Sequence, residues 1–328
     1  MGLGMDLAYY PLKKRTPEGS KTETNSMRQK TIKSSISCSG IGIHSGELVN
    51  IRLNPAPANH GIVLIRTDLF PRVRIPAICE YIKSALNAST LGVNGTRVGT
   101  VEHLMAALAG LGVDNVEVEV DGPEIPILDG SAAPFVNLIR AAGIIELPSP
   151  RSYLVVRKPV EVRVNGSYAS VKPSLESKIN CTISYNHPLL HHQEREVSLN
   201  TEHFVSEIAS ARTFGFLEDV DRLRSMGLAK GGSLHNAVIF DKERVVNPEG
   251  FRFDDECVRH KVLDLIGDMA LCGMPVLGEI TVHKAGHALH HMLVHRLLSN
   301  PECFDVVEDT DPHRPAINPH QVATWARA

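Results

Sequence analysis

The chain has 328 residues, 43% of them hydrophobic and 22% charged, which is ordinary for a globular protein and long enough to favour two domains. Lysine and arginine total 34 against 37 acidic residues, so the formal charge of −3 gives no basic excess that would favour nucleic acid or an anionic membrane. No run approaches the roughly 18 apolar residues of a membrane span; we therefore expect no stable membrane insertion, although a lipid substrate stays open.

The six cysteines lie far apart and form no C-x-x-C pair, which argues against a zinc ribbon or a thioredoxin-like redox site. Met1–Lys30 is polar and lacks the apolar core of a signal peptide, so we expect a disordered leader there. These features together predict a protein of the reducing cytoplasm, and we expect it to be a monomer.

The first half alternates strand-like and helical segments. Strands are expected at Thr31–Ile36, Leu48–Leu53, Gly61–Thr67, Val73–Ile78 and Asn115–Val120, with a turn at Ser39–Gly46 and helices at Thr100–Gly112 and Ala132–Ala142. Thr100 can cap its helix, and Glu102 in the first turn complements the helix dipole. The dipole explains Glu102 well, but it gives no reason for His103 in an otherwise apolar helix.

The second half repeats this order after a boundary expected at Leu147–Arg151, where two prolines separate a helix from new strands. Strands are expected at Tyr153–Val164, Ala169–Pro173, Ile179–Tyr185, Ala237–Phe240 and Leu277–His283, and helices at Thr201–Ala211, Glu256–Leu271 and His287–Leu298. We therefore expect domains at 31–147 and 152–300, a separate module at 214–232, and a loose tail at 301–328.

The helix Glu256–Leu271 carries His260, Asp264 and Asp268 at intervals of four residues, which places all three on one face. Such a stripe is usually a solvated face, but histidine and aspartate at this spacing can also hold a divalent metal. Adding His103 from the first half would make a site of two histidines and one carboxylate, the pattern of a catalytic zinc with an open position. This site would lie between the two domains.

In that setting Glu102, next to a ligand, could take the proton of a water as general base. Cleavage of an amide also needs an acid for the departing nitrogen, and His283 and His287 are both candidates. Asp268 could pair with such a histidine and keep it charged near neutral pH.

A further histidine run, His287, His290, His291 and His295, lies on the last helix. It could form a second metal site, but no carboxylate accompanies it in the sequence, which favours a solvated helix face.

Five motifs in order resemble one family: T-V-E-H-L-M-A-A-L-A-G-L-G-V-D-N at Thr100–Asn115, P-E-I-P-I-L-D-G-S-A-A-P-F at Pro123–Phe135, A-R-T-F-G-F at Ala211–Phe216, V-R-H-K-V-L-D-L-I-G-D at Val258–Asp268 and G-H-A-L at Gly286–Leu289. They are similar to the zinc-dependent UDP-3-O-acyl-N-acetylglucosamine deacetylases of lipid A biosynthesis. The resemblance implies an α+β fold of two similar domains, each a sheet packed on helices, in a sheet–helix–helix–sheet sandwich with an insert in each domain.

The resemblance also implies an activity: hydrolysis of the N-acetyl group of an acylated UDP-N-acetylglucosamine, the committed step of lipid A biosynthesis. Zn²⁺ would be held by His103, His260 and Asp264, with Glu102 as general base and His287 as general acid oriented by Asp268. Substrate would be met by Thr213 at the oxyanion, by Lys261 at its polar end, by Tyr185 at the nucleotide base, and by Phe214 and Phe216 of an apolar passage for the acyl chain.

Two alternatives remain open from the residues alone. The first is a non-catalytic protein that binds a nucleotide sugar or lipid around a structural metal, although structural zinc sites are closed by four protein ligands and only three are named here. The second is an inactive relative that interacts through its tail.

Overall fold

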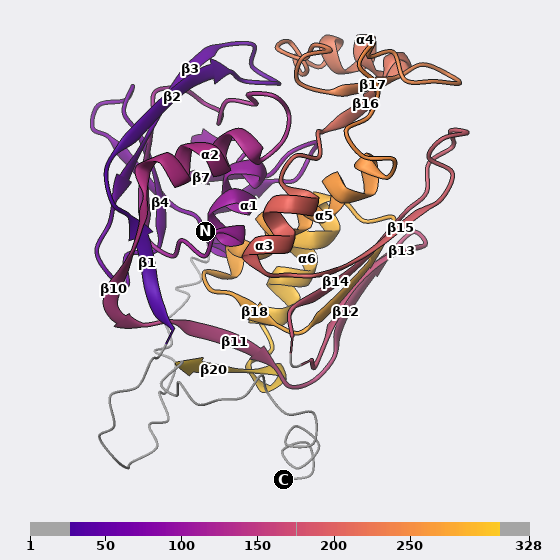
Figure 1. Ribbon diagram of the computed structural model, residues 1–328. Helices are drawn as coiled ribbons and strands as arrows, with labels where there is room; N and C mark the ends of the chain where they lie inside the picture. The colour runs from indigo at the N-terminus through magenta and orange to yellow at the C-terminus, as the bar shows by residue number, and fades with distance from the viewer. Residues whose placement is uncertain (1–26, 175, 309–328) are drawn as a thin grey trace, which may run out of the picture.

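The computed structural model describes residues 27–174 and 176–308. It consists of two halves side by side, each with a sheet on the outside and helices facing the other half (Figure 1). The helices α1 (Glu102–Gly110) and α2 (Ala133–Ala142) belong to the first half, and α5 (Glu256–Met269) and α6 (His287–Leu298) to the second. This arrangement confirms the predicted α+β sandwich.

The two main sheets share one topology. The first has the order β2-β3-β9-β4-β5, built from Ile36–Ile41, Leu48–Pro55, Val116–Val120, Ile62–Arg66 and Val73–Pro76. The second has the order β12-β13-β19-β14-β15, built from Val160–Val164, Ser167–Lys172, Glu279–His283, Lys178–Ile183 and Gln193–Ser198. In each sheet one pair is parallel, β4 with β9 and β14 with β19, so the halves are structural repeats.

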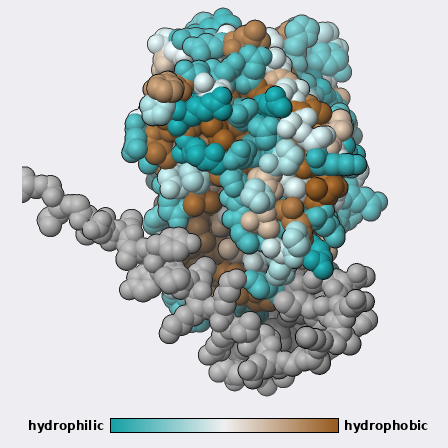
Figure 2. Space-filling view, turned by 90° about the vertical axis from the view of Figure 1, so that its left-hand side faces the viewer, coloured by the Kyte–Doolittle hydropathy of each residue, from teal (hydrophilic) through white to brown (hydrophobic). Residues whose placement is uncertain are grey.

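Strand patterning explains how each sheet covers its helices. Burial alternates along β3, β9 and β14, so every second side chain enters the core while the others face outward. On the outer face of the first sheet, Arg74 contacts Glu117 at 2.6 Å and Arg72 contacts Glu119 at 3.2 Å. Figure 2 shows this side of the molecule as mostly hydrophilic, with hydrophobic residues in separate patches.

Each half carries an insert. In the first half, β6 (Ile82–Ser84), β7 (Thr90–Val93) and β8 (Thr96–Val98) form a small sheet. In the second half, β16 (Phe214–Phe216) pairs in parallel with β17 (Val238–Phe240), and α4 (Leu217–Ser225) lies between them in sequence. This second insert stands at the upper right of Figure 1, above the second half.

The ends of the chain and the boundary stretch contain strands that were not expected. β1 begins at Arg28 and pairs with β10 (Ile144–Pro150), so the ordered chain starts before Lys30 and the prolines of the expected boundary lie within a strand. Proline is tolerated there because β10 pairs on one side only. β20 (Phe304–Glu308) pairs with β11 (Ser152–Val156), which also pairs with β18 (Val276–Leu277), so the chain beyond Asn300 is not all loose. Residues 1–26 and 309–328 lie outside the described residues.

Local details also differ. Thr100 does not cap α1, because its backbone has φ +53° and its hydroxyl donates to Glu124 instead. The helix expected at Thr201–Ala211 is a single turn, α3 (Thr201–His203), followed by π-helical turns at Phe204–Ile208. β15 was missed since its charged sequence Q-E-R-E-V-S forms a sheet edge. In the described ranges, no helix is both long and apolar enough to cross a bilayer.

Candidate metal centre and active site

The site lies where α1 crosses α5 between the two halves. α1 is buried at every position except Ala109, because its own sheet covers one side and α5 the other, and this explains its nearly continuous apolar sequence. At the crossing, a Cβ on Gly267 of α5 would overlap the backbone carbonyl of Glu102. Glycine at this position therefore lets the start of α1, with Glu102 and His103, rest directly on α5.

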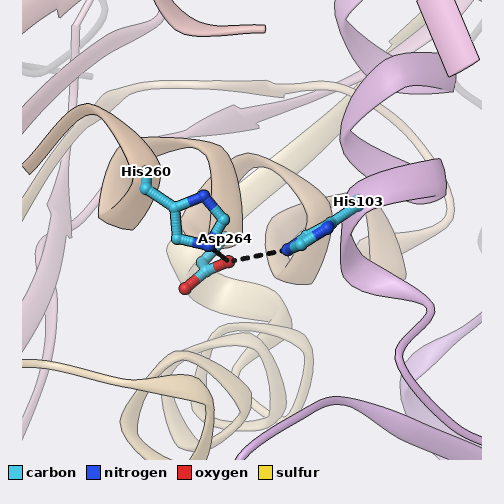
Figure 3. A group of neighbouring side chains, drawn as sticks. All are labelled: His103, His260 and Asp264. Carbon is cyan, nitrogen blue, oxygen red and sulfur yellow. Dashed lines mark ion pairs between the residues drawn. The ribbon is translucent and has the colours of Figure 1, made fainter. Parts of the chain in front are cut away.

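His103, His260 and Asp264 converge at this crossing (Figure 3). The Nε2 atoms of His103 and His260 lie 3.7 and 3.2 Å from Asp264 Oδ1, and one ligand atom from each residue falls within 4.8 Å of the others. All three residues are at most 3% exposed. The structure thus brings His103 of the first half next to His260 of the second half, although the two lie 157 positions apart in the chain.

The donor set fits a divalent metal. Asp264 Oδ1 is buried and makes no hydrogen bond within the described residues, although both imidazole nitrogens point toward it. His260 Nδ1 donates to the carbonyl of Ala211 at 3.0 Å, which leaves Nε2 free to coordinate, as is usual for a metal-binding histidine. Burial alone would raise the pKa of Asp264, but Lys261 and His260 hold that pKa well below its ordinary value, so the carboxylate is charged.

The Ala211 carbonyl is itself held in place by a buried ion pair. Arg212 Nε donates to Glu256 Oε1 at 2.9 Å, and the Arg212 backbone N–H donates to the same oxygen at 2.9 Å. Glu256 is the first residue of α5 and is fully buried. The Arg212–Glu256 pair therefore fixes the segment that follows Ala211 against the helix that carries His260.

Glu102 and His287 face each other across the same space, with Glu102 Oε1 3.8 Å from His287 Nε2. Glu102 Oε2 accepts from the backbone N–H of Ser89 at 3.0 Å, which fixes the orientation of the carboxylate. Burial raises the pKa of Glu102, while His287 and His103 oppose this effect. Burial would lower the pKa of His287, but Asp268, Glu102 and Asp264 together raise it to about 10.

Asp268 collects four donors, and three of them were not foreseen. His287 Nδ1 and His290 Nδ1 lie 2.7 and 2.8 Å from its Oδ2, while His291 Nε2 at 3.2 Å and the Ser89 hydroxyl contact its Oδ1. The expectation of a solvated histidine face is therefore wrong for His290 and His291, which are 1% and 7% exposed. The sequence could not show the carboxylate that they contact, because it belongs to another helix.

A cavity of about 1010 Å³ opens beside these groups and runs under the second insert. Its walls include all of the expected substrate residues, namely Thr213, Lys261, Tyr185, Phe214 and Phe216, together with Glu102, His103, Asp264 and His287. Lys261 Nζ lies 2.7 Å from Asp264 Oδ2 and 5.6 Å from the centre of the Phe214 ring. The rings of Phe214 and Phe216 lie 5.5 and 5.7 Å from that of Tyr185, so the aromatic wall is continuous.

Comparison with known proteins agrees with this geometry. Residues 29–299 match the family model of UDP-3-O-acyl N-acetylglycosamine deacetylase. The chain belongs to this family. A UDP-3-O-acyl-N-acetylglucosamine deacetylase of Myxococcus xanthus (strain DK1622) is 51% identical over 283 residues, covering 86% of this chain and 90% of that protein.

Other members of the deacetylase family are nearly as similar. The protein of that name from Anaeromyxobacter sp. (strain Fw109-5) is 48% identical over 292 residues, covering 89% of this chain and 95% of that protein. The one from Syntrophus aciditrophicus (strain SB) is 47% identical over 274 residues, covering 84% and 87%. Family membership makes the chain a hydrolase of the deacetylase type and confirms the resemblance drawn from the five motifs.

Proposed function

We propose that this protein is a zinc-dependent deacetylase that hydrolyses the N-acetyl group of UDP-3-O-(3-hydroxyacyl)-N-acetylglucosamine, giving acetate and a free amine in lipid A biosynthesis. The observation that carries the proposal is the convergence of His103 with His260 and Asp264, beside Glu102 and His287, on one wall of a large cavity. The names of the similar proteins support the substrate class.

His103, His260 and Asp264 would hold the zinc ion, and the unpartnered Oδ1 of Asp264 supports that assignment. When bound, the ion would polarise the amide carbonyl and lower the pKa of a water molecule. Three protein ligands leave a position open, which favours a catalytic over a structural role. The alternative of a structural metal in a binding protein is thereby disfavoured.

Proton transfer is assigned to Glu102 and His287. Glu102 takes the proton of the attacking water, with its other oxygen held by Ser89 so that Oε1 faces the reaction space. His287 donates Nδ1–H to Asp268, which leaves Nε2–H directed into the cavity toward the departing nitrogen. Its pKa of about 10 keeps it protonated at neutral pH, as a general acid requires.

Substrate contacts follow from the cavity wall. Thr213 would hold the oxyanion, Lys261 would meet the polar end of the substrate, and Tyr185 would stack on the nucleotide base. Phe214 and Phe216 would line the passage of the acyl chain beneath the insert. The volume of about 1010 Å³ lies at the upper end for small-molecule sites, which suits a long apolar chain.

We further propose that the protein acts as a cytoplasmic monomer. All six cysteines fall within the described residues and are free thiols, in keeping with a reducing compartment. Sedimentation analysis of the purified protein would show a dimer if the monomer proposal were wrong.

Acetate release from the acylated UDP-sugar tests the proposal. Chelation should abolish release, Asp264→Ala should lose metal and activity together, and Glu102→Ala should keep its metal while activity falls on the order of 10²-fold. Full turnover by protein that contains no divalent metal would contradict the mechanism. Retention of zinc with no acetate release by the wild-type chain would favour the binding protein instead.

A further inference from the structure

Glu124 is a buried carboxylate of the first half, in the segment between β9 and α2, and it is not one of the three candidate metal ligands. It is 3% exposed. Its Oε1 accepts from the Thr100 hydroxyl at 2.6 Å and from the His44 backbone N–H at 3.0 Å, and its Oε2 accepts from the Ser45 backbone N–H at 2.8 Å. Among the described residues no lysine or arginine pairs with it, and its hydrogen bonds come from Thr100, His44 and Ser45. Such a carboxylate fixes the position of every group that donates to it.

On one side, Glu124 supports the loop between β2 and β3, which contacts the second insert. The Gly231 N–H donates to the Ile43 carbonyl at 3.0 Å, and the Ala229 N–H lies 3.4 Å from His44 Nδ1. A Cβ on Gly231 would overlap the carbonyl of Gly42, so the two backbones touch directly. Ile43, His44 and Ala229 all line the cavity. Glu124 therefore lies behind the cavity wall where the halves meet.

On the other side, Glu124 holds Thr100, which lies two residues before the start of α1. Thr100 has φ +53°, an unfavourable conformation for a β-branched residue, and its hydroxyl bond to Glu124 helps to maintain it. The neighbouring backbone is tied as well, since the Gly99 N–H donates to the Pro123 carbonyl at 2.9 Å and the Ile125 N–H to the Gly99 carbonyl at 3.0 Å. The direction in which α1 starts therefore depends on Glu124.

We propose that Glu124 is a positioning residue that fixes the cavity wall at 229–231 and the start of α1 in one arrangement. The same carboxylate then determines both the position of the cavity wall that would contact the acyl chain and the alignment of Glu102 and His103. This inference rests on the proposed function, because it takes the cavity to hold an acyl chain and Glu102 to act on the amide.

Glu124→Gln tests the inference, because it replaces one oxygen, which accepts hydrogen bonds from backbone N–H groups, by an NH₂ group, which cannot accept them. We expect kcat on a short-acyl substrate to fall on the order of 10-fold, and KM for a long-acyl substrate to rise about 10-fold relative to the short one. Thr100→Val removes only the hydroxyl bond that holds the residues before α1, so it should lower kcat and leave the ratio of the two KM values unchanged. Glu119→Gln on the outer sheet face is the matched control and should change neither.

Amide hydrogen exchange of the substrate-free protein gives a readout independent of activity. Glu124→Gln should accelerate exchange in both 43–45 and 229–231, whereas Glu119→Gln should not. Unchanged kinetics and exchange in folded Glu124→Gln would overturn the inference, and so would an equal loss on both substrates. If Glu124→Gln does not fold, unchanged kcat in Thr100→Val would overturn it. If the wild-type chain releases no acetate from either substrate, the proposed function fails, and exchange alone decides the positioning role.

Discussion

Substitution of Gly267 by alanine tests whether the close crossing of α1 and α5 sets the geometry of the site. A Cβ at this position would lie 2.8 Å from the carbonyl carbon and 3.0 Å from the Cα of Glu102, and it would overlap the carbonyl oxygen. To bring that oxygen to ordinary contact of roughly 3.5 Å, the start of α1 must move away from α5 by about 1.5 Å. Glu102 and His103 would move with it, while His260 and Asp264 stay on α5.

A misplacement of this size can reduce catalysis on the order of 10²-fold, so we expect kcat/KM of Gly267→Ala to fall by about that factor. Zinc affinity should fall as well, because one of the three ligands moves away from the other two. In an ordinary helix the same substitution would stabilise the protein by about 1 kcal/mol, since alanine is the better helix former. If Gly267→Ala is instead less stable than the wild-type chain, the clash with α1 accounts for the loss.

Acetate release, metal content after dialysis and the thermal midpoint measure these effects. Gly110→Ala is the matched control. Its added Cβ would overlap the Phe204 ring at the far end of α1, away from Glu102 and His103. It should lower stability while zinc binding per folded chain is maintained. Wild-type kcat/KM together with a raised thermal midpoint in Gly267→Ala would refute the reasoning.

Three further predictions concern the buried charges. The rate should increase with pH as Glu102 loses its proton, at a pH above the ordinary pKa of a glutamate, and should fall near pH 10 as His287 loses its proton. In His287→Gln the fall at alkaline pH should be absent from the pH–rate profile. Asp268→Asn should lower the free energy of unfolding by about 3–5 kcal/mol at neutral pH. The folded pKa of Asp268 is depressed, so its contribution is present above its ordinary pKa and is lost as the pH falls below that value. Urea titrations at pH 7 and pH 2 should show a smaller difference at pH 2, and an equal difference would contradict this. His290→Asn should reduce kcat several-fold with KM unchanged, because the Asp268 carboxylate could then rotate away from His287. An unchanged kcat would show that His290 does not orient Asp268.

The parts of the site that share one helix could be predicted from the sequence. His260 and Asp264 are four residues apart, so any helix through them places both on one face, and α5 has the expected bounds to within two residues at its end. His103 could be singled out as a candidate ligand, because helix-dipole effects do not account for an imidazole in an otherwise apolar helix. The resemblance implied that the helices of the two halves pack against each other, but that they cross at Gly267 is known only from the structure.

The remaining contacts depend on tertiary structure. Ser89 meets Asp268 across 179 positions in the chain, and it lies in a polar stretch with no motif of its own. Glu124 lies in one of the five motifs, but no role was predicted for it, because two of its three partners are backbone N–H groups, which carry no sequence signal. The ends of the chain were misjudged for a similar reason, since β1 and β20 gain stability from pairing with β10 and β11 rather than from their own composition.

The division of the metal ligands between the halves has a thermodynamic consequence. An ion held by His103 on one side and by His260 and Asp264 on the other stabilises only the docked arrangement of the two repeats. Affinity for the ion and adhesion between the repeats are thus a single linked equilibrium, in which each strengthens the other by the same factor. Any substitution along the seam therefore reaches the chemistry through the metal, however far from the substrate it lies.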